Sequence, residues 1–221
     1  MMMTQDCELL CAWRAGDRAA GDALVAAHFA SVCRFFRTKL GDDVEDLIQQ
    51  TFLDLLAASS PVTSVRATLF TIARRRLLDH LRTRYQRDEI ELVTSISVAD
   101  LGTTPSAAAA RNEQQRLLHE ALQGITLDHR MALELAYWED LSGPEIAEVL
   151  EIPENTVRSR LARARQALRD QVEALARTQA AKQQSAPAGT QVELQDRMPQ
   201  GAADLLSRLE ETLDQLAPSS D

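Results

Sequence analysis

Residues 141–170 read LSGPEIAEVLEIPENTVRSRLARARQALRD, and this stretch decides the fold. Ser142 is followed three residues later by Glu145, with Pro144 between them, an arrangement typical of a helix N-terminus. Residues 151–153 (EIP) form a short break, after which apolar residues return at spacings of four, three and four. Such spacing is typical of a helix that is buried on one face. The stretch therefore predicts a helix-turn-helix.

The second of these two helices is strongly basic, and its cations are all arginines. In a helix-turn-helix, the N-terminal part of the second helix reads base edges in the major groove, and arginine suits both guanine edges and phosphates. The side chains expected to face DNA are Asn155, Thr156, Arg158, Ser159, Ala162 and Arg163. The alternative is an ordinary helical hairpin whose arginines form a solvated face.

Working outward, the rest of the chain also reads as helical. Aromatic residues make up 4% of the 221 residues, and there are only 8 glycines and 7 prolines, a composition that favours helix over sheet. Apolar periodicity predicts helices at 5–14, 18–40, 43–57, 64–85, 107–123 and 126–139. We therefore expect an all-α fold.

Two details of these helices are specific enough to be tested. Asp42, with Glu45 three residues later, is expected to cap the helix at 43–57. The apolar face of the helix at 18–40 is expected to comprise Leu24, Val25, Phe29, Val32, Phe36 and Leu40.

Three cysteines, Cys7, Cys11 and Cys33, fit a reducing compartment. Together with His28 they could in principle bind zinc. We expect them instead to be buried structural residues, because Cys7 and Cys11 share an apolar stripe and no CxxC pair is present.

The net charge of −9, taken as an average, argues against a nucleic-acid partner. The acidic residues are unevenly placed, however. Residues 88–110 hold four carboxylates and no basic residue, and residues 178–221 are also acidic. Residues 64–87, in contrast, carry seven arginines against a single aspartate. The average charge therefore does not exclude DNA binding.

Several functional classes are not expected. No apolar run approaches the ~18 residues of a membrane span, and the N-terminus does not resemble a signal peptide, so we expect a cytoplasmic protein. The histidines show no triad or metal-ligand spacing, and there is no glycine-rich phosphate loop. We therefore expect no enzyme activity, no catalytic residue, no metal and no cofactor.

Three segments together resemble a known family. DDVEDLIQQTFLDLL (42–56), RATLFTIARRRLLDHLRTR (66–84) and the helix-turn-helix segment are similar, in order and separation, to bacterial RNA polymerase sigma factors of the extracytoplasmic function (ECF) group of the sigma-70 family. The resemblance implies two small helical domains joined by a flexible linker. The implied divisions are sigma domain 2 at 1–87, an acidic linker at 88–110, sigma domain 4 at 111–177, and a C-terminal extension at 178–221 with an amphipathic helix at about 201–216.

The resemblance also implies partners and site residues. Asp46, Gln49 and Gln50 match the face that binds the clamp on the largest subunit of core RNA polymerase, although the family usually has Glu where Gln50 stands. The alternative is that these three residues are only the solvated face of a helix. The helix-turn-helix residues match the reader of the promoter −35 element. The flap of the polymerase and an anti-sigma factor are further implied partners, and we expect a monomer when the chain is free.

The segment at 59–76 matches the region that reads the −10 element and captures a flipped base. Here Thr68 stands where the family often has Trp, and Arg75 where it often has Asn, so −10 preference and promoter melting are open questions. The alternative for the arginines is that some of them pair with Asp79 or Asp54. The candidate −10 residues are Arg66, Thr68, Arg74, Arg75, Arg76, His80 and Arg82.

Two other functions are weighed against the sigma factor. One is a stand-alone helix-turn-helix regulator, and the other is a protein-interaction module whose DNA face is vestigial or masked.

The acidic linker suits a basic polymerase channel, or is a plain solvated linker. The leucine stripe near the C-terminus either packs on the sigma domains or a partner, or belongs to a loosely ordered extension.

Overall fold

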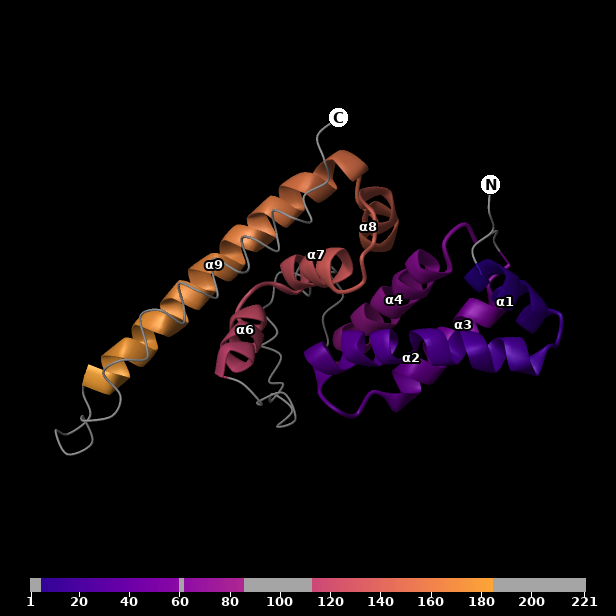
Figure 1. Cartoon of the computed structure of the whole chain (residues 1–221), viewed down its shortest axis with the longest axis horizontal. Helices are drawn as coiled ribbons and strands as arrows, with labels where there is room; N and C mark the ends of the chain where they lie inside the picture. The colour runs from indigo at the N-terminus through magenta and orange to yellow at the C-terminus, as the bar shows by residue number, and fades with distance from the viewer. Residues whose placement is uncertain (1–4, 60–61, 86–112, 185–221) are drawn as a thin grey trace.

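The computed structural model describes residues 5–59, 62–85 and 113–184, and all the regular elements in these ranges are α-helices. They form an N-terminal unit, α1–α4, and a C-terminal unit, α6–α9 (Figure 1). The helices are α1 (Gln5–Arg14), α2 (Arg18–Leu40), α3 (Glu45–Ala57), α4 (Val65–Tyr85), α6 (Glu113–Gln123), α7 (Leu127–Tyr137), α8 (Gly143–Leu150) and α9 (Glu154–Gln184). The predicted all-α fold is confirmed.

The ends of α2 follow from local chemistry. The Asp17 side chain accepts hydrogen bonds from the backbone N–H groups of Ala19 (2.9 Å) and Ala20 (3.3 Å), which satisfies two free donors of the first turn. At the other end, Gly41 adopts φ 87° and donates its N–H to the Arg37 carbonyl. A positive φ favours glycine, so α2 ends where the sequence predicts.

The predicted cap of α3 is wrong. The helix begins at Glu45 with Val44 at the N-cap position and no side-chain cap, while the Asp42 carbonyl accepts the Val44 N–H at 3.0 Å. Val44 is only 1% exposed. Burial of this residue fixes where the helix starts, and Asp42 is left in the preceding turn, 3.9 Å from the Arg37 guanidinium.

Two further expectations about buried side chains are also wrong. Phe29 is 49% exposed, and the inward positions of α2 around it belong to His28 and Val32. Cys11 is exposed, whereas Cys7 and Cys33 are buried. The rest of the expected face of α2 is buried or half-buried, so only these two positions, at the edges of the buried stripes, were assigned wrongly.

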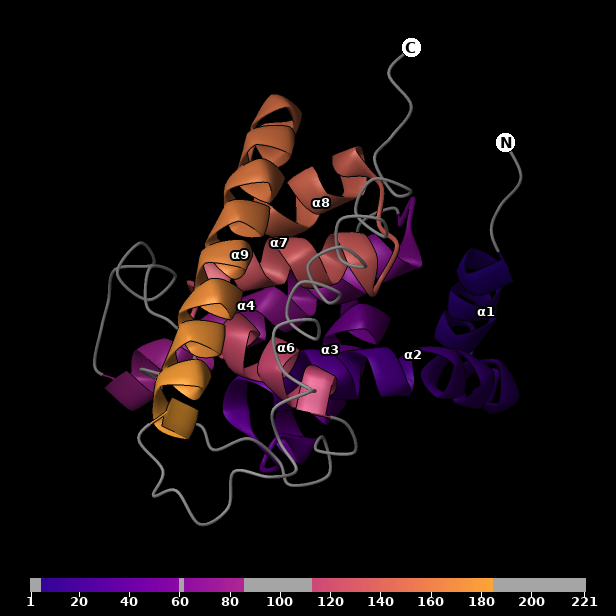
Figure 2. The same ribbon diagram turned by 60° about the vertical axis from the view of Figure 1, so that its left-hand side comes forward.

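The two units share one apolar core, which periodicity alone did not predict. A single buried cluster includes Leu69 and Leu77 of α4 together with Met131 of α7 and Ile146 and Leu150 of α8. Both views place α7 and α8 beside α4 (Figures 1 and 2). A second, smaller cluster joins α6, α7 and α9 within the C-terminal unit. The C-terminal unit is thus packed against the N-terminal unit through buried apolar side chains.

α9 is longer than predicted, and two predicted segments lie outside the described residues. α9 continues to Gln184, past residue 177, where we expected the helical domain to end. The acidic linker at 88–110 and the amphipathic helix at about 201–216 lie outside the described residues. Within the described ranges, no helix combines the length and the apolar character needed to cross a membrane.

Candidate nucleic-acid interfaces

The helix-turn-helix has the predicted form, and local interactions fix its angle. At the start of α8 the Ser142 N–H donates to the Glu145 carboxylate at 2.9 Å, and Pro144 lies in the first turn. Glu151 ends α8 in the left-handed conformation, with φ 56° and ψ 44°. The Ile152 N–H then donates to the Ala147 carbonyl at 3.1 Å, which closes the turn before α9.

The predicted recognition face of α9 is brought together as one exposed surface. Its members are all exposed, except Thr156, which is half-buried; they are Asn155, Thr156, Arg158, Ser159, Ala162 and Arg163. Buried Val157 and Ala164 anchor the opposite side of the helix. No contact within the described residues holds the Arg158 side chain, and the only polar contact of Arg163 is a long one, 3.4 Å, to the Ser159 hydroxyl. Both guanidinium groups are therefore free to meet a ligand.

Other arginines of α9 have a structural role. Arg160 donates to Asp128 at 2.6 Å, and Arg165 donates to the Tyr137 hydroxyl at 3.3 Å. Both contacts join α9 to α7 or its C-terminal end. Burial, followed by the nearby Arg160 and Arg163, lowers the pKa of His129 despite the adjacent Asp128. The basic character of α9 is therefore divided between an outer face and an inner, structural one.

The candidate −10 residues of α4 do not share one face. Thr68, Arg75 and Arg82 are spaced by seven residues, so they lie in one row along the helix. Arg66, Arg76 and His80 lie on another side. Burial and the neighbouring Arg84 lower the pKa of His80, although Asp43 opposes them. The Thr68 hydroxyl donates to the Ser64 carbonyl at 2.9 Å.

Most of the α4 arginines have partners, as the alternative interpretation allowed. Arg76 donates to Asp54 at 2.6 Å and Arg82 donates to Asp79 at 2.6 Å. Arg74 and Arg75 have a partner that we did not predict. Arg74 is 6% exposed and donates to one oxygen of Glu151 at 3.0 Å, while Arg75 donates to the other oxygen at 2.8 and 3.1 Å. The hydrogen bonds from Arg75, and then those from Arg74, lower the pKa of Glu151.

The candidate polymerase-binding residues lie together on the exposed side of α3. Asp46, Gln49 and Gln50 are exposed, while Ile48 and Leu55 fix the opposite side in the core. Leu53 continues the same row and is 49% exposed, a residue that the sequence analysis missed. The signal was available, since an apolar residue one turn beyond Gln49 and Gln50 interrupts a polar row. A single exposed leucine is common on protein surfaces, so Leu53 extends the row without by itself marking an interface.

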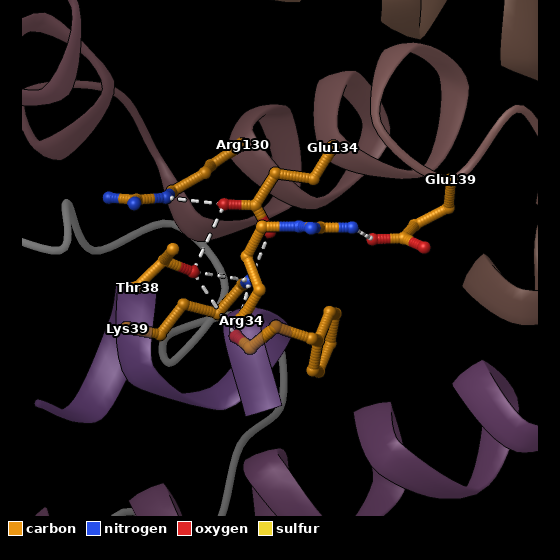
Figure 3. A network of polar contacts seen from close by, with 7 residues as sticks. Arg34, Thr38, Lys39, Arg130, Glu134 and Glu139 are labelled. Atoms are coloured by element: carbon orange, nitrogen blue, oxygen red, sulfur yellow. Dashed lines mark hydrogen bonds and ion pairs between the residues drawn. The ribbon is translucent and has the colours of Figure 1, made fainter. Parts of the chain in front are cut away.

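A buried group of charges joins α2 to α7 (Figure 3). The Glu134 carboxylate accepts hydrogen bonds from Lys39, from Thr38 at 3.3 Å and from the Arg130 Nε at 2.8 Å. Lys39 and Arg130 are both 0% exposed and Glu134 is 3% exposed. Burial lowers the pKa of Lys39 to about 8 despite Glu134, and it would raise the pKa of Glu134, but Lys39 and Arg130 bring that pKa below its ordinary value.

A second pair lies beside this group, where Arg34 of α2 donates to Glu139 at 2.6 Å. Glu145 forms a third link between the units, accepting from the Ser64 hydroxyl at 2.6 Å. Burial would raise the pKa of Glu145, but its hydrogen bonds to Ser64 and Ser142 lower it overall. The described side chains include no group of three or more His, Cys, Asp or Glu placed to bind a metal ion.

Comparisons with known proteins agree with this geometry. The sigma-70 region 2 family matches residues 24–87, and the sigma-70 region 4 family matches residues 115–168. The ECF RNA polymerase sigma factor SigL of Mycobacterium tuberculosis is 30% identical over 161 residues, which are 70% of this chain and 90% of SigL. The RNA polymerase sigma-H factor of Pseudomonas aeruginosa is 29% identical over 180 residues, covering 74% and 92% of the two chains.

Among solved structures, CnrH in complex with the cytosolic domain of CnrY has a similar fold. The TM-score is 0.56 at 24% identity, and the likeness covers 77% of this chain and 98% of CnrH. The two family matches fall on the two helical units in the expected order. The chain therefore belongs to the sigma-70 family, as a sigma factor of the extracytoplasmic function group that directs RNA polymerase to promoters.

Proposed function

We propose that three surfaces of this sigma factor divide the work of promoter recognition. The exposed row on α3 binds the clamp of core RNA polymerase, the outer face of α9 reads the −35 element, and α4 contacts the −10 element. The observation that carries the proposal is the outer face of α9, where Arg158 and Arg163 are exposed at the N-terminal part of a recognition helix.

The α9 assignment is supported by the difference between its inner and outer arginines. Arg160 and Arg165 make contacts to the C-terminal unit itself, so their removal would disturb the fold. Arg158 and Arg163 make no such structural contact within the described residues, which leaves their forked donors available for guanine edges or phosphates.

The experiment is in vitro transcription by core polymerase with this chain on genomic fragments, followed by variants of a promoter found in this way. Arg158→Ala combined with Arg163→Ala should lose discrimination between correct and altered −35 elements, by about 1–3 kcal/mol for each base contact removed. Arg177→Ala is the matched control, because Arg177 is an exposed arginine farther along the same helix. Unchanged −35 preference in the double variant would contradict the assignment.

The α3 assignment is supported by a compact, exposed row with Leu53 in it. Gln50→Glu restores the charge that the family usually has there, and we expect core polymerase to bind this variant a few-fold more tightly, on the scale of one exposed charge pair. Gln5→Glu adds the same charge at an exposed position of α1 and should change nothing. Equal effects of the two substitutions on core affinity would show that only net charge matters.

A protein regulator is a further proposed partner. CnrH was solved with the cytosolic domain of CnrY, so a chain of this fold is able to hold a second protein. We propose that an anti-sigma factor binds this chain as well, and co-purification of the full chain from its native cells, followed by mass spectrometry, tests this.

A further inference from the structure

Helix α1 precedes the segment that matches sigma-70 region 2. It packs along α2 (Figures 1 and 2) and is fixed near both of its ends. The Asp6 carboxylate lies 2.9 Å from the His28 Nε2. The Trp13 ring lies against Gly21, where an added Cβ would meet the ring at 2.5 Å. Because Leu10 between these two contacts is only 1% exposed, α1 has a defined place in the N-terminal unit.

From this place, α1 supplies a cation to the end of α3. The Arg14 guanidinium donates to the Leu55 carbonyl at 3.0 Å. Carbonyls in the last turn of a helix have no partner within the helix, and a cation beside them is favourable. The last turn of α3 contains no basic residue of its own, so the cation comes from a residue 41 positions earlier in the chain. Arg14 therefore stabilises the point at which the chain leaves α3.

Helix α1 also contacts the backbone that leads into α4. The Cys7 side chain is buried, and its thiol, a weak donor, lies 3.7 Å from the Val62 carbonyl oxygen that accepts from it. Ser64 follows soon after, and its hydroxyl accepts the Ala67 N–H at 3.2 Å, which caps the start of α4. The Cys7 contact thus fixes the backbone just before this cap.

The first turn of α4 carries two of the proposed −10 residues, Arg66 and Thr68. The Thr68 hydroxyl donates to the Ser64 carbonyl at 2.9 Å, so the direction of this side chain follows that of the cap. Glu145 of the C-terminal unit also contacts Ser64. The two contacts made by α1, in contrast, lie within the N-terminal unit and do not depend on how the two units pack.

We propose that α1 positions the −10-reading end of α4, with Arg14 and Cys7 as the positioning residues. Arg14 holds the end of α3 and Cys7 holds the approach to α4, so together they set the direction in which the first turn of α4 points. Both act through the backbone of the connection between the two helices, and neither side chain touches DNA. This inference rests on the proposed role of α4 in −10 binding.

The test uses the full-length chain with core polymerase on a promoter that it transcribes, with a fluorescent adenine analogue in the −10 element reporting strand opening. Arg14→Ala should slow opening about two- to fivefold, the scale of one cation at a helix C-terminus. Arg14→Lys keeps the charge and a donor, and it should restore most of the rate. The matched control is Arg18→Ala, which removes an exposed arginine at the start of α2 and should leave the rate unchanged. Core affinity and −35 preference should not change in any of these variants.

A second set of variants tests the contact before α4. Cys7→Ala should slow opening, whereas Cys7→Ser, which keeps a donor, should open the promoter like the wild type. Cys11→Ala removes an exposed thiol from the same helix and should have no effect. Thermal unfolding followed by circular dichroism confirms that each variant is folded at the assay temperature.

The salt dependence of promoter affinity separates positioning from direct contact with DNA. Removing an arginine that binds a phosphate reduces the salt slope by about one, whereas removing a positioning residue leaves the slope unchanged. The proposal is overturned if Arg14→Ala and Arg18→Ala slow opening equally, or if Arg14→Ala reduces the slope.

Arg66→Ala combined with Thr68→Ala is measured in parallel, to test the role of α4 itself. No effect of this double variant on opening or on −10 preference would refute the role of α4 in −10 binding. A clear effect of the double variant, together with none from Arg14→Ala, refutes the role of α1 alone.

Discussion

Glu134→Gln should loosen the packing of the two units. The carboxylate of Glu134 is the acceptor for two fully buried cations, Lys39 and Arg130 (Figure 3). Glutamine keeps the shape and one acceptor oxygen but removes the negative charge. The variant therefore leaves two positive charges in a dry contact with no carboxylate directly against them.

The cost of Glu134→Gln depends on whether each of the two cations is able to release its proton. The pKa of Lys39 is already lowered from 10.5 to about 8, so at pH 7 this lysine escapes the lost partner by releasing its proton, at a cost of about 1 kcal/mol. Arg130 cannot release its proton, and its two terminal nitrogens have no hydrogen-bond partner among the residues that the structure describes. Arg130 carries the remainder of the roughly 3–5 kcal/mol typical of a broken buried pair.

The matched control is Lys39→Met. This substitution leaves one buried cation, Arg130, with one carboxylate, Glu134, and methionine fills similar space. Because Arg130 still pairs with Glu134, no buried charge is left without a partner, and we expect a cost of about 1 kcal/mol, the scale of one lost hydrogen bond. The two variants remove opposite members of the same contact, and only the loss of the carboxylate should be costly.

The pH dependence provides a second signature. The packed chain holds the Lys39 pKa below its value in the opened or unfolded chain, so the opened chain keeps this proton when the packed chain loses it. Loss of the Lys39 proton therefore increasingly stabilises the packed chain as the pH rises from about 8 to 10.5. At pH 9 the wild-type Lys39 is already neutral, so the cost of Glu134→Gln should be smaller than at pH 7 by about 1 kcal/mol.

Urea unfolding followed by circular dichroism, at pH 7 and at pH 9, measures these free energies, and small-angle X-ray scattering reports separation of the units. The expected result is a lower urea midpoint or a larger radius of gyration for Glu134→Gln alone. Equal behaviour of Glu134→Gln and Lys39→Met, in both measurements, would refute the reasoning from unequal buried charges.

Two further predictions concern stability. Gly21→Ala would place a methyl group 2.5 Å from the Trp13 ring, and the resulting overpacking should lower the free energy of unfolding by about 1–3 kcal/mol. The control is Gly143→Ala, which has open space around the new methyl group and should be neutral or slightly stabilising. Equal costs of the two substitutions in thermal unfolding would contradict the packing argument. Ser142→Ala removes a hydroxyl that donates to Glu145 at 2.7 Å and should cost about 1 kcal/mol; an unchanged melting temperature would show that this cap contributes nothing.

Local signals accounted for most of the helices and for the outer face of α9. The start of α8 at Ser142, the break at Glu151–Pro153 and the buried stripe through Val157 and Ala164 are all properties of neighbouring residues. The same local reasoning failed at Asp42, which looked like a cap. The burial of Val44 decided the helix start there, and that burial depends on tertiary packing.

Local patterns could not predict the charged contacts between the two units. Lys39 looks like an ordinary basic residue in the last turn of α2, and its partner Glu134 is 95 residues away. Glu151 looks like a solvated turn residue, yet its partners Arg74 and Arg75 lie more than 70 residues earlier. Periodicity reports which side of a helix is buried, but it does not report which distant helix covers a polar side.

The proposed binding surfaces differ in how exposed they are in the packed chain. The proposed polymerase-binding row on α3 and the proposed −35 face of α9 are both exposed while the units are packed. On α4, Arg74 is 6% exposed and bound to Glu151, whereas the Arg75 side chain is 63% exposed although it also contacts Glu151. Any partner separates the two units only if it binds the separated arrangement more tightly than the packed one, since a partner shifts an equilibrium only by its difference in affinity for the two states.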